Sequence, residues 1–214
     1  MNRKKLWLLF APVLLAALID QLTKQLVRTT PSLQNLEVIP GWLVFAYTQN
    51  PGMALGIDWF PTWAISLISM VAVAGIFIYV AKNLNQATPG YLICMGLILG
   101  GALGNIIDRL IMAKIEGYGH ILQGRVNDFL YFTFSIGGDP VFPYIFNMAD
   151  VFISTSIILL LLFNRRLLPE PAQKPLADQS SAWNQLCLIP QQPQGIKHHH
   201  HSRSFMSDDR PTHT

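Results

Sequence analysis

Four runs of apolar residues constrain this chain more than any other feature. They are Leu6–Leu26, Trp63–Ala81, Tyr91–Ile107 and Met148–Phe163. A helix that crosses a bilayer needs about 20 residues, so the fourth run is short unless Tyr144–Asn147 adds a turn. Charged residues make up 13% of the chain, whereas a soluble domain usually carries about 25%. The sequence therefore predicts an all-α membrane protein with four transmembrane helices.

Basic residues at the two ends of the four-span region predict its orientation. Arg3, Lys4 and Lys5 precede the first run, and Arg165 and Arg166 follow the last. The positive-inside rule places both termini in the cytoplasm. This bias is weakened by basic residues on the other side, namely Lys24, Arg28, Arg109, Lys114 and Arg125. The basic start resembles a signal peptide, but no A-x-A site follows, so we expect an uncleaved first span.

The segments outside the spans differ in character. In the first outer loop, "LEVIPGWLVFAYTQNPG" holds two β-prone runs broken by Pro40-Gly41, which predicts a small periplasmic β-element. The alternative is a loop that is only anchored at the membrane by its aromatic residues. From about Pro169 the chain becomes rich in Pro, Gln and Ser. We therefore expect a membrane domain over residues 1–168 and a disordered cytoplasmic tail over 169–214.

Small residues recur every fourth position in the third run. Gly96, Gly100 and Gly104 form a stripe along one helix face. Such a stripe lets a second helix approach closely, so we interpret it as a packing surface.

Polar residues gather at the outer ends of the predicted spans. Asp20 and Lys24 lie one helical turn apart, within reach of an ion pair. Asp108 is followed directly by a basic residue, so a structural role is as plausible as a catalytic one for either acid. Asp128 and Asp150 differ, because each follows an asparagine closely, lies among apolar and aromatic residues, and has no adjacent cation.

Two carboxylates brought together at a partly dry site can share one proton and act on a peptide bond as general acid and general base. That is the chemistry of an aspartic peptidase, but the spacing alone leaves other classes open. A small proton-coupled transporter or channel also uses intramembrane acids, although the acids here cluster at one face and no inverted repeat occurs. A third class is a non-catalytic scaffold held by the Asp20–Lys24 pair and the glycine stripe.

Five motifs, taken in order, favour the first class. "DQLTK", "NPGMALG", "GALGNIIDRL", "GRVNDFLYF" and "FNMADVFIS" resemble those of the lipoprotein signal peptidase (signal peptidase II) family, over about residues 5–166. The resemblance implies a bacterial inner-membrane aspartic endopeptidase that cleaves prolipoproteins before the diacylglyceryl-modified cysteine. It implies a catalytic dyad of Asp128 and Asp150. It further implies supporting or substrate-binding roles for Asn50, Gly52, Asn105, Arg109, Asn127 and Asn147, and leaves Asp20, Lys24 and Asp108 as structural residues.

Two features depart from the family pattern. Leu55 stands where an aromatic residue is common, and the stretch "TFSIGGDP", which includes a third outer acid at Asp139, is longer than expected.

The sequence shows no motif that predicts a metal, another cofactor or a disulfide framework. The run His198–His201 has no further ligand at useful spacing and no HExxH motif occurs, so we expect neither a metal nor another cofactor. Cys94 lies in a span and Cys187 in the tail, which implies no disulfide framework. The expected partners are prolipoprotein substrates and membrane lipid, with no nucleic acid.

Overall fold

Three long helices follow the first three apolar runs of the sequence. In the computed structural model, which describes residues 3–52 and 60–167, α1 spans Arg3–Thr29, α2 spans Thr62–Asn83 and α3 spans Pro89–Ile115. Within these described ranges, they are the three helices that are long and apolar enough to cross a membrane. The described residues all belong to one compact unit, Met1–Glu170. The predicted tail beyond Pro169 lies outside them.

The fourth apolar run forms a short helix, as the length of the run indicated. Helix α4 covers Met148–Leu162 and is followed by the single turn α5, Asn164–Leu167. Its 15 residues rise about 22 Å, less than the hydrocarbon core of about 30 Å. Tyr144–Asn147 adds no helical turn, because Ile145–Phe146 forms strand β6 instead. The prediction of four apolar helices is confirmed, and α4 by itself is shorter than the other three.

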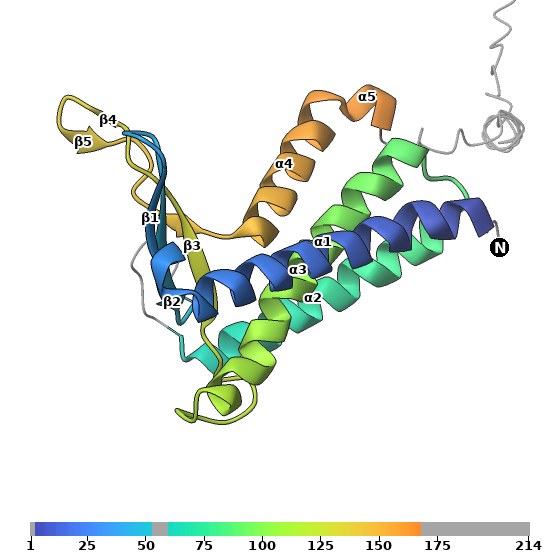
Figure 1. The fold of residues 1–214 in the computed structure, drawn as a ribbon. Coiled ribbons are helices and arrows are strands. Elements are labelled where there is room, and N and C mark those ends of the chain that lie inside the picture. The colour runs from blue at the N-terminus through green and yellow to red at the C-terminus, as the bar shows by residue number, and fades with distance from the viewer. Residues whose placement is uncertain (1–2, 53–59, 168–214) are drawn as a thin grey trace, which may run out of the picture. The chain divides into compact units, whose positions relative to one another are not determined.

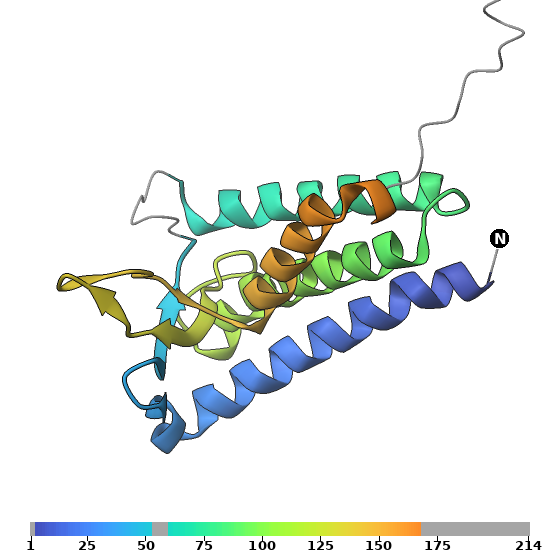
Figure 2. The ribbon, with the colours of Figure 1, turned by 90° about the horizontal axis from the view of Figure 1, so that it is seen from above.

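Helix α3 lies at the centre of the helical part, with α1, α2 and α4 packed around it (Figures 1 and 2). The glycine stripe makes this packing possible. A Cβ atom at Gly96 would lie 2.5 Å from the backbone oxygen of Leu9, and one at Gly100 would overlap that of Val13. At Gly104 it would overlap the carboxyl group of Asp20. The predicted packing surface is therefore confirmed, and it brings α1 against α3 at backbone distance.

A small antiparallel sheet lies across one end of the helices (Figure 1). Its strands are β1 (Asn35–Ile39), β2 (Leu43–Asn50), β3 (Val126–Phe132) and β6, in the order β1-β2-β3-β6, and the short 3-10 helix Pro31–Leu33 precedes it. The predicted β-element around Pro40-Gly41 is confirmed as the β1–β2 hairpin. The sheet also includes β3 and β6 from the second loop, which the sequence pattern did not predict. Their pairing joins segments that are distant in sequence, which local patterns do not reveal.

Two apolar clusters enclose the polar residues of the protein. One joins α1, α2 and α3 around Leu9, Leu92 and Leu99. The other packs Val27 of α1 against Phe129 of β3 beneath the sheet. On α1, the buried residues Asp20 and Lys24 fall between these clusters. The polar groups are thus held between two dry layers at the sheet end of the helices.

Candidate active site

Asp150 lies in the first turn of α4, where its carboxylate caps the helix. Asp150 Oδ2 accepts a hydrogen bond from the backbone N–H of Asn147 at 3.1 Å, and Asn147 Oδ1 accepts one from the backbone N–H of Asp150 at 3.1 Å. This reciprocal capping box satisfies two backbone donors, and the helix dipole favours negative charge at this end. A carboxylate is therefore tolerated at the start of an otherwise apolar helix.

Asp128 lies in the buried part of strand β3, with 3% of its surface exposed. Its carboxylate accepts hydrogen bonds from the side-chain amides of Asn50, at 3.0 Å, and Asn147, at 2.5 Å. Burial and the negative charge of Asp150 raise the pKa of Asp128 to about 7, and the two amide hydrogen bonds offset this only in part. Near neutral pH this carboxyl group can therefore hold a proton.

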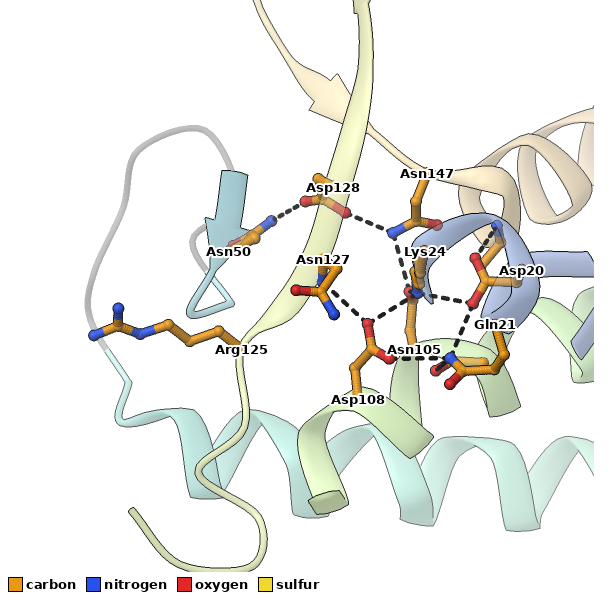
Figure 3. Close-up of polar contacts among 12 residues, drawn as sticks. Asp20, Gln21, Lys24, Asn50, Asn105, Asp108, Arg125, Asn127, Asp128 and Asn147 are labelled. Atoms are coloured by element: carbon orange, nitrogen blue, oxygen red, sulfur yellow. Dashed lines mark hydrogen bonds and ion pairs between the residues drawn. The ribbon is translucent and has the colours of Figure 1, made fainter. Parts of the chain in front are cut away.

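The two acids are joined through Asn147, which is completely buried. Its Nδ2 donates to Asp128 Oδ1 and, at 3.1 Å, to Asn105 Oδ1, while its backbone N–H donates to Asp150 (Figure 3). Asn105 Nδ2 in turn donates to Asp150 Oδ1 at 3.2 Å. Asn147 thus contacts both carboxylates, Asp128 through its side-chain amide and Asp150 through its backbone N–H. The side-chain amide of Asn105 also contacts Asp150. The structure brings together the two acids that the sequence singles out.

A second group of polar residues, the Lys24 cluster, lies beside them. It consists of Asp20, Gln21, Lys24 and Asp108, and three of its four members are almost completely buried. Lys24 Nζ lies 2.8 Å from Asp20 Oδ2, 3.2 Å from Asp108 Oδ2 and 2.8 Å from Asn105 Oδ1. An ammonium group has three N–H donors, so all three are used. Gln21 Nε2 donates to Asp108 Oδ1 at 3.0 Å.

Each acid of the Lys24 cluster also holds the backbone next to one of the two site acids. Asp20 Oδ1 accepts from the backbone N–H of Ala149 at 2.9 Å, immediately before Asp150. Asp108 Oδ2 accepts from the backbone N–H of Asn127 at 3.0 Å, immediately before Asp128. Because Lys24 binds both, one cation connects the start of α4 to strand β3 (Figure 3).

Strand β2 supplies further groups beside Asp128. Between Phe45 and Thr48 its pairing with β3 is interrupted by a bulge, a feature often found next to active sites. Tyr47 lies in this bulge and its hydroxyl donates to Asn127 Oδ1 at 2.9 Å. In the sequence, Tyr47 stood out only as one of the aromatic residues of the first outer loop, which suit the headgroup zone, and Gln21 was not singled out. The only sequence signal for a role of Gln21 is its position, directly after Asp20 and about one turn before Lys24 on an otherwise apolar helix.

Gly52 supports Asn50 through its backbone. Its N–H donates to Asn50 Oδ1 at 2.9 Å, which orients the amide that binds Asp128. Its φ of +109° favours glycine, and a Cβ atom there would lie 2.6 Å from Ile65 Cδ1. A glycine is therefore required by the backbone at this position.

The two arginines near the site behave differently from what sequence adjacency suggests. Asp108 pairs with Lys24, so the expectation that its cation is the adjacent Arg109 is wrong. Arg109 interacts electrostatically with Asp128, Asp150 and also Asp108, and its buried Nε has no hydrogen-bond partner among residues 3–52 and 60–167. Arg125 points away from the site and lies over the ring of Tyr118, 5.2 Å from its centroid (Figure 3).

The remaining sequence predictions concern residues outside this site. Asp139 lies in the separate hairpin β4–β5, while Leu55 and His198–His201 fall outside the described residues. In the part of the chain that is described, no three His, Cys, Asp or Glu side chains are grouped so that they could hold a metal ion.

The chain is similar to known proteins over most of its length. Residues 12–165 match the family model of signal peptidase (SPase) II. A lipoprotein signal peptidase from Chlorobium luteolum is 34% identical over 78% of this chain and 95% of its own. One from Symbiobacterium thermophilum is 36% identical over 70% of this chain and 88% of its own. A solved structure of a bacterial membrane enzyme is 26% identical, with a TM-score of 0.56, over 73% of this chain and 91% of its own.

Proposed function

The chain belongs to the signal peptidase II family, an aspartic protease family of the membrane, and on that premise we propose that Asp128 and Asp150 are its catalytic dyad. The enzyme removes signal peptides from prolipoproteins, and we infer that it cuts before a diacylglyceryl-modified cysteine. The observation that carries the proposal is the contact of Asn147 with both carboxylates. Family membership does not support the alternative of a transporter or channel.

The proposed reaction uses one proton shared by the dyad. Asp150, as carboxylate, takes a proton from a water molecule whose oxygen attacks the scissile carbonyl carbon. Asp128 donates its proton to the carbonyl oxygen, which gives a neutral gem-diol. Asp150 then protonates the leaving amine as the C–N bond breaks, and the proton of one gem-diol hydroxyl returns to Asp128. The raised pKa of Asp128 suits it to the acid role near neutral pH.

The other predicted residues support this dyad in our proposal. Asn50, Asn105 and Asn147 orient the two carboxylates, and Gly52 orients Asn50. Asn127 links β3 to the Lys24 cluster through its backbone, and Tyr47 fixes its side chain. Asp20, Lys24 and Asp108 are structural. Arg109 has an unused donor close to the dyad, which suits it to bind the substrate.

Removing the amide of Asn50 should shift the pH dependence of cleavage. The rate needs a proton on the dyad, so it should fall as pH rises through the pKa of Asp128, about 7. The Asn50 hydrogen bond stabilises the charged carboxylate and lowers this pKa, so Asn50→Ala should raise it. A hydrogen bond to a charged group contributes about 1.5–3 kcal/mol, so the alkaline limb of kcat/KM should move up by about one to two pH units.

The control for this experiment is Asn83→Ala. Asn83 donates to the carbonyl of Tyr79 within α2, far from the dyad in sequence. Its profile should match that of the unmodified enzyme. If the limb of Asn50→Ala stays in place or moves to lower pH, Asn50 does not act on the charge of Asp128.

The proposed location is the bacterial inner membrane, with both termini in the cytoplasm. The basic residues at Arg3–Lys5 and Arg165–Arg166 support this orientation. A reporter fused after Arg166 should be active in the cytoplasm, and one inserted at Gly117, beyond the end of α3, should be active in the periplasm. A cytoplasmic Gly117 would overturn the orientation and, with it, a periplasmic site. We assign catalysis to residues 1–168 and none to the tail 169–214.

A further inference from the structure

A hairpin without a role in the site extends from the second loop. Strands β4 (Ser135–Ile136) and β5 (Asp139–Pro140) pair across Gly137 and Gly138. The φ angles of these glycines, +65° and +96°, are those of a tight type I′ hairpin turn. The hairpin belongs to the stretch that is longer than the family pattern leads one to expect.

The surface of this hairpin is apolar and exposed. Ile136 is 75% exposed, and the side chains of Val141, Phe142 and Tyr144 are also exposed. From Phe134 to Phe146 the sequence contains a single charged residue, Asp139. Contiguous exposed apolar surface of this kind marks an interaction site with a protein or a membrane.

Aromatic contacts hold the hairpin to the sheet. Phe134 stacks on Trp42, with ring centroids 5.6 Å apart. Phe142 makes edge contacts with Phe132 at 6.2 Å and Phe146 at 5.6 Å. The exposed residues therefore extend from a fixed base.

The position of the hairpin favours a lipid partner. The sheet lies across the end of the helical part at which α2 begins, and the hairpin projects from the sheet beyond the helices (Figures 1 and 2). The exposed rings of Phe60 and Trp63 lie at that same end of α2, where aromatic residues mark the membrane–water boundary. The β4–β5 ladder has only two residues per strand, too short an edge to add a partner's strand.

We propose that the β4–β5 hairpin is an interfacial membrane anchor that inserts Ile136 and Val141 into the boundary between lipid headgroups and acyl chains. Asp139 lies opposite Ile136 at the turn and is the one charged residue of the segment 134–146. The partner is the bilayer itself, and the anchor is independent of the proposed dyad.

The test measures the surroundings of spin labels on the full chain. Nitroxides are attached at Ile136→Cys and Val141→Cys in a background with Cys94→Ala and Cys187→Ala, in nanodiscs of phosphatidylethanolamine and phosphatidylglycerol. The control is Glu37→Cys on β1, also exposed but charged in the native chain. Prolipoprotein cleavage by each labelled protein verifies its fold.

The expected result is that labels at 136 and 141 collide with dissolved oxygen more often than with a water-soluble nickel complex. The label at 37 should show the reverse preference. Preference for nickel at all three sites would overturn the proposal, because the hairpin would then lie in water. Shielding of 136 and 141 from both reagents would also overturn it, because the hairpin would then contact protein.

Discussion

Asp128→Asn and Asp150→Asn should each abolish cleavage of a diacylglyceryl-modified prolipoprotein while the protein still inserts and folds. Asparagine keeps the size of the side chain, but it can neither take a proton from water nor donate the shared one. A proton-transfer group contributes about 10²–10⁴ in rate, and the peptide bond here depends on both. The double variant should be little worse than either single one, because the pair acts as a unit. The measurement is gel-shift processing by purified protein in detergent, with a chelator present.

The matched control is Asp139→Asn, which makes the same change at an exposed acid in the β4–β5 hairpin. It should process substrate at the unmodified rate. Substantial cleavage by either dyad variant would show that the bond is cut by other groups. Loss of the unmodified enzyme's activity with chelator would point to a metal-dependent mechanism and contradict the aspartic one.

Local patterns in the sequence predicted those parts of the structure that depend on neighbouring residues. The apolar runs became helices, and Pro40-Gly41 became the turn of a hairpin. The pair Asp20–Lys24 has the four-residue spacing that brings side chains together on a helix, and it forms an ion pair at 2.8 Å. The ordered motifs named the family, which the comparisons confirm.

Contacts between distant segments could not be predicted in the same way. Asp108 is adjacent to Arg109 in sequence, yet successive residues on a helix point in different directions, and its partner is Lys24 on another helix. That pairing depends on how closely α1 approaches α3 at the glycine stripe. The role of Asn147 as the link between Asp128 and Asp150 is equally long-range, because it depends on β3 lying beside the start of α4.

Lys24→Met should destabilise the protein more than any other single change we propose. Methionine keeps an unbranched apolar side chain of nearly the same length but leaves Asp20 and Asp108 buried without their shared cation. Removing one partner of a buried ion pair costs about 3–5 kcal/mol, out of a typical total stability of about 5–15 kcal/mol. We expect a large fall in the denaturant midpoint of unfolding in detergent. Cleavage should fall with it, since Asn105 loses a donor and both backbone tethers lose their common cation.

A second ion pair, which Arg28 of the same helix α1 makes with the C-terminal end of α3, provides the comparison that tests this reasoning. Arg28 lies 3.4 Å from Glu116, and both side chains are partly exposed. A pair of this kind contributes at most about 1 kcal/mol, so Arg28→Met should barely move the midpoint. Equal losses for the two methionine variants would mean that burial does not set the strength of the Lys24 contacts.

The triple variant Asp20→Asn, Lys24→Met, Asp108→Asn separates the effect of Lys24 on stability from its effect on the positions of the site residues. Without buried unpaired charge it should regain much of the stability, yet cleavage should stay low if Lys24 is what holds Asn105 and the two acid-bearing segments in place.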